Sequence, residues 1–264
     1  MLPARCSYFS QKIPSLPRSS CYFCATMTFD ITLPVLNEAA TLDRQVRILH
    51  DFLWKNFPEP GQWKIVIADN GSTDDTRHIA AALCDEFAEI QLVRVPEKGV
   101  GLALKTSWNQ SQADIVGYMD LDLATDLRHF LQAYNALSSE GFDLVYGTRL
   151  HKRSRVFGRT LKREITSRIF NWMLKTYLGT RFSDGMCGFK WLRREHVASL
   201  QASGATSNGW FFSTELLAIA EWKGLKMCEL PVIWTDDTTS SRVNITRLAK
   251  QYIAAMRILK KRKP

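Results

Sequence analysis

Short apolar runs along the chain alternate with longer segments in which apolar residues recur every three or four positions. The runs predict five buried strands, at residues 29–33, 64–68, 90–95, 115–119 and 144–146. The first long segment, residues 41–57, predicts a helix whose apolar face consists of Leu42, Val46, Leu49 and Leu53. Strands that alternate with helices are typical of a mostly parallel sheet with helices on both faces. The pattern therefore predicts an α/β fold.

The two ends of the chain differ from this regular pattern. Residues 1–26 show no periodicity and contain no acidic residue, so we expect a disordered N-terminal extension, or a start at Met27. The last segment predicts an amphipathic helix with its apolar residues at Ile245, Leu248, Tyr252, Ala255 and Leu259. We therefore divide the chain into the extension, an α/β domain at residues 27–242 and a basic amphipathic helix and tail at residues 243–264.

Positive charge is concentrated in two stretches of a chain whose net charge is +9 over 264 residues. Residues 147–175 contain nine Lys and Arg against one acid, and residues 242–264 contain eight and no acid. The rest of the chain after residue 26 is acidic. Charge placed in this way indicates a polyanionic partner at particular places, which leaves nucleic acid, a membrane surface and a phosphate-bearing substrate open.

Composition narrows the class of protein. No run of about 18 apolar residues occurs, so no transmembrane helix is predicted. The six cysteines do not form a disulfide framework in a chain of this length, and scattered thiols are typical of a cytoplasmic protein. Cys21 and Cys24 have the spacing of metal ligands, but the only further candidate nearby is Cys6, so we do not expect a zinc site.

Acidic and amide side chains follow three of the predicted strands. Asp120 and Asp122 come directly after residues 115–119, and on an extended segment they point the same way, roughly 6–7 Å apart. Two such carboxylates repel each other unless a cation lies between them, and Mg²⁺ or Mn²⁺ would complete its shell with water and phosphate oxygens. The sequence therefore predicts a metal–diphosphate site. Asn37 and Asp69 are explained equally well as turn formers.

Three other functions fit the residues less well. Gly99 and Gly101 imitate a dinucleotide-binding fingerprint, but its third glycine position is Leu104. A nucleic-acid-binding domain fits the charge alone, since RNA-binding aromatic signatures are missing and the two acids stay unexplained. A nucleotide-sugar pyrophosphorylase would need a glycine-rich loop after the first strand, which is absent. We therefore expect an enzyme with no nucleic-acid partner.

Six motifs, in order, resemble those of inverting family-two glycosyltransferases of the GT-A fold: LPVLNEAATL, IVIADNGSTDDT, DLDLATD, DLVYGTR, DGMCGFKWLRRE and WFFSTELLAIAEWKGLKMCELPVIW. The similarity is greatest to the dolichyl- or polyprenyl-phosphate mannose or glucose transferases, and it runs from about residue 29 to 242. The resemblance implies one GT-A type doubly wound domain. It also implies transfer of mannose or glucose, with inversion, from GDP-mannose or UDP-glucose to a polyprenyl or dolichyl phosphate. Another lipid or saccharide hydroxyl as acceptor is the alternative.

The resemblance also implies roles for individual residues. The nucleotide pocket would be lined by Pro34, Leu36, Asn37, Glu38 and Asp69, with Asp120 next to it. The metal would be held by Asp120 and Asp122. The acceptor phosphate would be bound by Arg149, Arg163 and Arg242. The catalytic residues would be Asp122, Asp184 and Arg149.

A second group of residues would lie beneath and behind the sugar. By resemblance, this group consists of Asp184, Gly188, Phe189, Lys190 and Glu215. Asp184 and Glu215 either orient a sugar hydroxyl or are structural carboxylates that pair with an arginine. The family lysine between two glycines is Val100 here, so Lys98 or Lys105 would have to replace it.

A polyprenyl acceptor has to be reached at a membrane. In residues 147–175 a basic loop precedes a segment rich in large apolar residues, which fits a helix at an anionic membrane surface or an amphipathic helix packed on the sheet. For the C-terminal helix, the two interpretations are peripheral binding to a membrane and a merely solvated basic tail. We expect a protein on the cytoplasmic face of a membrane, held peripherally, whose oligomeric state the sequence leaves open.

Overall fold

The computed structural model describes residues 26–235 and 245–263, with side chains given from residue 251 onward in the second range. The predicted extension, apart from Thr26, lies outside the described residues. So do Cys21, Cys24 and Arg242.

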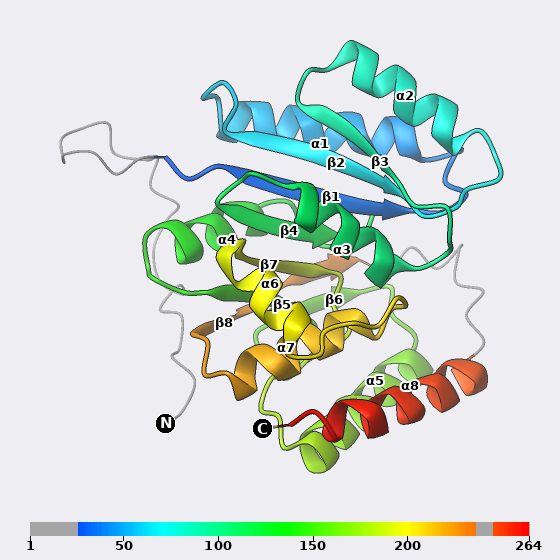
Figure 1. Cartoon of the computed structure of the whole chain (residues 1–264), viewed down its shortest axis with the longest axis vertical. Coiled ribbons are helices and arrows are strands. Elements are labelled where there is room, and N and C mark those ends of the chain that lie inside the picture. Colours follow the sequence, from blue (N-terminus) through cyan, green and yellow to red (C-terminus); the bar gives the residue numbers. More distant parts are fainter. Residues whose placement is uncertain (1–25, 236–244, 264) are drawn as a thin grey trace.

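The centre of the molecule is a seven-stranded sheet in the order β3-β2-β1-β4-β7-β5-β8 (Figure 1). Its strands are β1 (Phe29–Val35), β2 (Trp63–Asp69), β3 (Ile90–Arg94), β4 (Ile115–Met119), β5 (Leu144–Thr148), β7 (Phe189–Arg193) and β8 (Met227–Pro231). Neighbouring strands are parallel, except that β7 runs antiparallel to both β4 and β5. The prediction of a mostly parallel sheet is confirmed, and β7 and β8 are the strands of this sheet that the sequence pattern did not predict.

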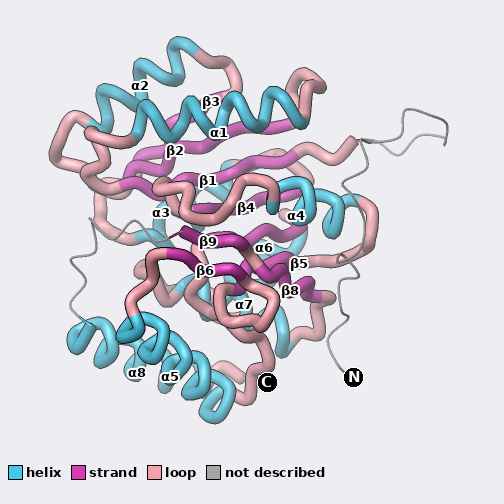
Figure 2. The backbone as a smooth tube through the Cα atoms, turned by 180° about the vertical axis from the view of Figure 1, so that it is seen from behind, coloured by secondary structure: helices cyan, strands magenta, loops and turns pink. Residues whose placement is uncertain are grey.

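Helices cover both faces of the sheet (Figures 1 and 2). One face is covered by α1 (Leu42–Asn56), α2 (Thr76–Glu86) and α4 (His129–Ser138). The other is covered by α3 (Val100–Gln110), α6 (Glu195–Ala202) and α7 (Phe212–Trp222). A second, two-stranded sheet pairs β6 (Arg155–Phe157) with β9 (Ile233–Thr235).

The strands supply both halves of the core because successive side chains point to opposite faces. In β4, Ile115 and Met119 pack with the core under α1, α2 and α4, whereas Val116 and Tyr118 pack under α3, α6 and α7. The predicted apolar face of α1 is fully buried. Burial on both faces explains why these strands are nearly continuous apolar runs.

The remaining two helices, α5 (Leu161–Leu178) and α8 (Ile245–Lys260), lie against each other at one end of the molecule (Figures 1 and 2). Thr160 caps the start of α5 by accepting a hydrogen bond from the Arg163 N–H. Gly179 ends it in the left-handed conformation, with φ of 69°. The α8 helix matches the amphipathic helix predicted at this end. None of the helices in the described part of the chain has the length and apolarity needed to span a membrane.

The inner faces of α5 and α8 are part of the core. Leu174 and Leu178 of α5 and Met256 and Leu259 of α8 are buried in the same apolar cluster. The Tyr252 ring lies 5.2 Å from the Phe170 ring, centroid to centroid. The apolar face predicted for the C-terminal helix therefore packs on the protein where its side chains are described.

Candidate functional site

The candidate site lies where the parallel strands end. Because β1, β2, β4 and β5 share one direction, the residues that follow them meet at one edge of the sheet. Those residues include the loop after β1, Asp69 at the end of β2, Asp120 after β4 and Arg149 after β5. The fold thus brings together groups that lie up to 113 positions apart in the sequence, from Leu36 to Arg149.

The loops after β1 and β2 are joined by hydrogen bonds. The side-chain oxygen of Asn37 accepts from the Thr73 N–H at 2.8 Å, and the Asn37 N–H donates to Ser72 Oγ. The Glu38 N–H donates to Thr76 Oγ1 at 2.7 Å. Asn37 has a positive φ of 58°, which Asn tolerates better than most residues. The turn-forming role considered for Asn37 is therefore present in the structure.

The residues expected to line the nucleotide pocket lie in or beside these joined loops. Pro34 and Leu36 are half-buried, and Asp69 is buried with Oδ1 accepting the Ser72 N–H at 2.9 Å. Oδ2 of Asp69 has no hydrogen bond within the described ranges, so this oxygen remains for a ligand. Their contact with a nucleotide stays a prediction.

Asp120 occupies an unusually confined position. Its N–H donates to the Gly188 carbonyl, and Oδ1 of its carboxylate is buried without a hydrogen-bond partner in the described part of the chain. A Cβ atom at position 188 would lie 1.9 Å from Asp120 Oδ2, so only glycine leaves room for this carboxylate. Burial, reinforced by the charge of Asp122, raises the pKa of Asp120 to about 6. Asp122 itself is exposed, with Oδ1 accepting the Ala124 N–H at 3.0 Å.

This pair of carboxylates fits a hard divalent cation. A buried carboxylate oxygen without a donor and a second carboxylate that repels it are relieved by one cation. No group of three or more His, Cys, Asp and Glu within residues 26–235 and 245–263 is arranged to hold a metal by itself. Asp120 and Asp122 would therefore hold Mg²⁺ or Mn²⁺ only together with water and oxygens of a bound diphosphate.

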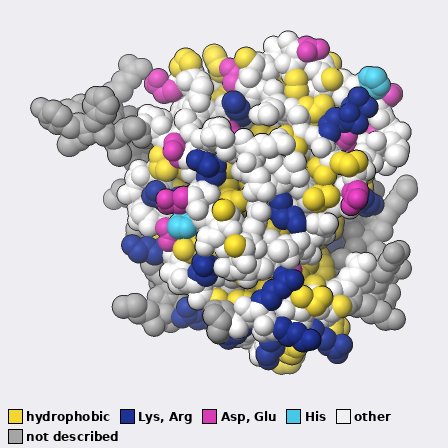
Figure 3. All heavy atoms as spheres, viewed as in Figure 1, with side chains coloured by type: hydrophobic (Ala, Val, Ile, Leu, Met, Phe, Trp, Pro, Cys, Tyr) yellow, Lys and Arg dark blue, Asp and Glu magenta, His cyan; other side chains and the backbone are white. Residues whose placement is uncertain are grey.

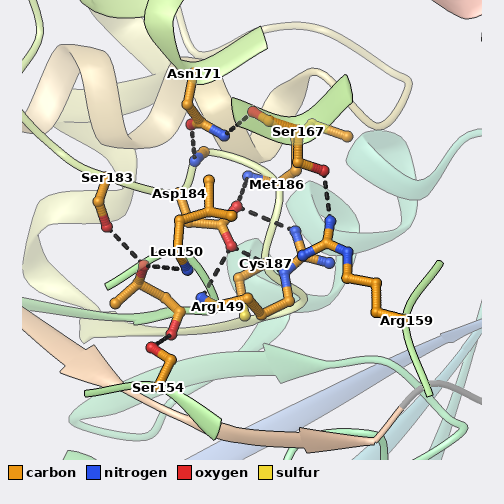
Figure 4. A network of polar contacts seen from close by, with 12 residues as sticks. Arg149, Leu150, Ser154, Arg159, Ser167, Asn171, Ser183, Asp184, Met186 and Cys187 are labelled. Atoms are coloured by element: carbon orange, nitrogen blue, oxygen red, sulfur yellow. Dashed lines mark hydrogen bonds and ion pairs between the residues drawn. The ribbon is translucent and has the colours of Figure 1, made fainter. Parts of the chain in front are cut away.

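Arg149 and Asp184 form a buried ion pair beside the acids (Figure 4). Asp184 Oδ2 accepts from Arg149 Nε at 2.8 Å and from the Arg149 N–H, and Oδ1 accepts from Nη2 and from the Met186 N–H. Burial disfavours the Asp184 charge, but Arg149 outweighs this effect and lowers the pKa of Asp184 to about 2. Both oxygens of Asp184 are thus engaged in holding Arg149, which corresponds to the structural role considered for it. Its direct part in catalysis stays a prediction.

The segment from Asp184 to Phe189 is held in place by hydrogen bonds from the buried side chain of Lys190. Lys190 Nζ donates to the Cys187 carbonyl at 2.6 Å and to the Gly185 carbonyl at 3.3 Å. Burial lowers the pKa of Lys190 to about 8. Lys190, a residue of β7, therefore stabilises the conformation of the loop that precedes this strand.

Glu215 has a comparable structural task. Its Oε2 accepts from the N–H groups of Thr206 and Ser207, at 3.0 and 2.7 Å. This loop packs on the start of α3, since a Cβ atom at Gly101 would lie 2.3 Å from the Ser207 carbonyl oxygen. The glycines that imitate a dinucleotide fingerprint are thus explained by close packing of two backbones.

The two lysines considered as replacements for the family lysine, Lys98 and Lys105, have different surroundings. Lys105 Nζ donates to the Thr206 carbonyl and to Asn208 Oδ1, at 2.6 and 2.7 Å, so it is used within the protein. Lys98 is exposed in the turn before α3.

Among the expected acceptor-phosphate residues, Arg149 and Arg163 fall in the described part of the chain. Arg163 is half-buried in the first turn of α5. Two residues that the sequence pattern did not assign to the site lie beside Arg149, namely Arg159 and Trp234. Arg159 belongs to a basic stretch of the sequence, but no signal distinguishes it there from its neighbours.

The comparisons with known proteins agree with this arrangement. The profile of the family described as Glycosyl transferase family 2 matches residues 30–200. The chain is 30% identical over 235 residues to glycosyltransferase AglD of Haloferax volcanii, covering 89% of this chain but only 37% of AglD. It is 24% identical to dolichyl-phosphate β-glucosyltransferase ALG5C of Trichomonas vaginalis, covering 97% of this chain and 79% of that protein.

Solved structures show the same architecture. Glucosyl-3-phosphoglycerate synthase from Mycobacterium tuberculosis, in complex with UDP, superimposes with a TM-score of 0.64 and 25% identity, covering 90% of this chain and 81% of that one. Its complex with Mn²⁺, UDP-glucose and glycerol 3-phosphate gives a TM-score of 0.63 at 23% identity, covering 91% and 82%. The fold is therefore of the GT-A type. The chain belongs to glycosyl transferase family 2.

Proposed function

We propose that this protein transfers a hexose from a nucleoside diphosphate sugar to a polyprenyl or dolichyl phosphate, with inversion at the anomeric carbon. Relatives named dolichyl-phosphate β-glucosyltransferases support a lipid phosphate as acceptor. They favour glucose over mannose, and the solved neighbour that binds UDP-glucose favours UDP-glucose over GDP-mannose. The catalytic domain is residues 27–242, and residues 243–264 form the C-terminal helix and tail.

One observation carries the choice of a lipid acceptor. The segment that bears the arginines leads directly into α5, whose outer side presents four exposed apolar residues at helical spacing, Leu161, Ile165, Ile169 and Trp172. We call these four residues the α5 stripe. The segment that bears the arginines is thus continuous in sequence with a surface that suits a prenyl chain.

The groups around the α5 stripe suit an anionic membrane. Lys and Arg side chains gather over α5 and α8, at the lower end of the face in Figure 3. A groove of about 280 Å³ between the two helices is lined by Met173, Thr176, Tyr177, Ile253, Met256 and Arg257. Apolar side chains that enter the lipid boundary beside basic ones are typical of peripheral membrane helices. We propose that this end of the molecule lies on the cytoplasmic face of a membrane.

The residues of the site divide the chemical task. The joined loops after β1 and β2 would bind the nucleotide, and Asp120 and Asp122 would hold Mg²⁺ or Mn²⁺. The cation, when bound, supplies positive charge that stabilises the departing nucleoside diphosphate. Arg149, fixed by Asp184, orients the acceptor phosphate, since a planar guanidinium binds phosphate oxygens through paired hydrogen bonds.

A general base is not needed for this reaction. A phosphate monoester has a second pKa of about 6, so it is ionised near neutral pH. Its oxygen forms the bond to the anomeric carbon as the bond to the diphosphate breaks, and no proton has to be removed. Orientation then accounts for much of the catalysis.

A panel of donors and acceptors tests the proposal. With Mn²⁺ or Mg²⁺ present, we expect UDP-glucose and a polyprenyl phosphate to give nucleotide release and a glucosylated lipid. UDP-N-acetylglucosamine and GDP-mannose serve as alternative donors. Free polyprenol, which lacks the phosphate, should not react. Transfer to 3-phosphoglycerate but not to polyprenyl phosphate would replace the lipid acceptor by a soluble one.

We expect the double substitution I169Q/W172Q to weaken binding to vesicles of phosphatidylcholine with 30% phosphatidylglycerol by about tenfold or more. The reason is that Trp172 is 64% exposed and Ile169 53% exposed, so little native packing is lost while the apolar contact with lipid is removed. Co-sedimentation with sucrose-loaded vesicles measures the effect. Trp54→Gln is the matched control, because Trp54 is 53% exposed on α1, away from the stripe. Equal binding by all three proteins would contradict membrane contact through α5.

A further inference from the structure

Arg159 lies beside Arg149 and has no role in the function proposed above. The Arg149 and Arg159 guanidinium carbons lie 5.4 and 5.9 Å from the centre of the same Trp234 ring. Figure 4 shows the two side chains converging next to Asp184 and Cys187. Two like charges are therefore held at one aromatic ring, an arrangement that an anion would stabilise.

The Arg159 side chain is only 7% exposed, yet its donors are incompletely used. Nη2 donates to Ser167 Oγ and to the Arg163 carbonyl. Nε and Nη1 are buried without a hydrogen-bond partner in the described part of the chain, although Nη1 lies 3.2 Å from Glu164 Oε2. Burial and the charge of Arg149 lower the pKa of Arg159. A buried guanidinium with unused N–H groups is costly unless a ligand accepts from them.

Within the described residues, the ion pairs of these arginines are partly shared. Asp184 is paired with Arg149. Glu164 is shared between Arg159 and Arg168, and Nη2 of Arg168, on the same helix as Glu164, lies 2.7 Å from Glu164 Oε1. Arg159 thus shares its carboxylate with Arg168, and Arg149 is paired with Asp184 alone among the ion pairs of the described residues. In addition, Nη1 of Arg149 has no hydrogen-bond partner among the described residues, because its bonds to Asp184 use Nε and Nη2. Both guanidiniums therefore have N–H groups without a hydrogen-bond partner among the described residues at this one place.

This place adjoins the acid pair. Trp234 forms a bridge with Thr125, and the Thr235 N–H donates to the Ala124 carbonyl at 2.9 Å, so β9 is attached to the loop that carries Asp122. Arg149 lies close enough to Asp120 to act on its charge. An anion bound at the two arginines would therefore lie next to the diphosphate of a donor held at Asp120 and Asp122.

We propose that Arg159 and Trp234 complete, with Arg149, the site that binds the phosphate monoester of the acceptor. Arg159 donates N–H groups to the phosphate, and the Trp234 ring holds both guanidiniums in place. This inference rests on the proposed function for the identity of the ligand. The recognised chemistry is a phosphate monoester, whether a prenyl chain or a small soluble molecule carries it.

Calorimetric titration with geranyl phosphate, a soluble prenyl monophosphate, tests the site. We expect Arg159→Gln to weaken binding about 10- to 100-fold, as is usual for charge-assisted hydrogen bonds to a phosphate. Arg155→Gln is the matched control, because Arg155 is exposed on the neighbouring strand β6 and the charge change is identical. In turnover assays, the KM for the acceptor should rise in Arg159→Gln while the KM for the sugar nucleotide stays unchanged.

A second variant and a second ligand separate the effects of charge, hydrogen-bond geometry and the prenyl chain. Arg159→Lys keeps the charge without the planar fork, so this variant should bind geranyl phosphate with intermediate affinity. If Arg159→Gln melts at a lower temperature than the wild type, Arg159→Lys takes its place in the comparison with Arg155→Gln. Glycerol 3-phosphate should lose affinity in the same proportion as geranyl phosphate, since the phosphate is the shared group. Equal affinity of Arg159→Gln and Arg155→Gln for geranyl phosphate would overturn the inference.

The two proposals fail separately. Arg159-dependent binding of geranyl phosphate without sugar transfer to any lipid phosphate would refute the proposed function and keep the anion site. Sugar transfer with an acceptor KM that does not depend on Arg159 would keep the function and refute the role of Arg159.

Discussion

Asp122→Ala is expected to abolish sugar transfer while the fold stays intact. Asp122 is exposed after β4, and the hydrogen bond that its carboxylate accepts from the Ala124 N–H stabilises the local turn. Removal of the carboxylate takes away one of the two protein ligands of the proposed cation. We expect kcat to fall by about 10²–10³-fold or more, because the charge on the leaving diphosphate is then poorly stabilised. Release of UDP from UDP-glucose measures the loss.

A binding measurement tests the same variant independently of turnover. In the presence of UDP, Mn²⁺ should bind to the wild-type protein and much more weakly to Asp122→Ala. Asp51→Ala is the control, since the Asp51 side chain is 87% exposed on α1 and should change neither quantity. Full activity, or unchanged Mn²⁺ binding, in Asp122→Ala would refute the assignment of the metal ligands.

Asp184→Ala is expected to lower the free energy of unfolding by about 3–5 kcal/mol, as is usual when one partner of a buried ion pair is removed. The substitution leaves the Arg149 guanidinium buried and without its carboxylate. Urea denaturation measures the change. Asp43→Ala breaks the exposed pair with Arg47 and should cost less than about 1 kcal/mol. A similar small loss for both variants would show that Asp184 is not buried as an ion.

The dependence on pH gives a second check on Asp184. Its pKa is lowered from an ordinary value of 3.8 to about 2, so the folded state binds its proton less readily than the unfolded state. The resulting stabilisation, about 2 kcal/mol, is therefore complete above about pH 4 and is lost as the pH falls through about 2. The stability difference between wild type and Asp184→Ala should shrink over this range. A difference that stays constant from pH 5 to 2 would contradict the depressed pKa.

Periodicity predicted the elements of the fold that are regular along the chain. The strands β1, β2, β4 and β5 are largely apolar runs buried on both faces, and α1 has one buried stripe, so consecutive residues indicate the environment of each element. The antiparallel β7 differs from them. Its sequence, FKWLR, contains Lys190, whose buried Nζ also donates to the hydroxyls of Tyr118 and Ser213, which lie 72 and 23 positions away in the sequence.

The candidate site likewise combines residues that the local sequence predicted with contacts between remote residues that it did not predict. Asp120 and Asp122 are close in sequence and follow a strand, so their spacing alone was enough to predict a metal site. The confinement of Asp120 by Gly188, the saturation of Asp184 by Arg149, and the approach of Arg159 to Trp234 join positions 35 to 75 residues apart. No local pattern indicates such pairs.

By itself, the sequence determined the α/β class, the edge of the sheet at which the ligand groups meet, and the acid pair, because these follow from local periodicity and from the common direction of parallel strands. Only the tertiary structure decided which charged groups are buried, which are already paired, and which retain unused donors. Burial and pairing depend on distances between remote segments, and those distances arise only when the sheet and its helices pack together.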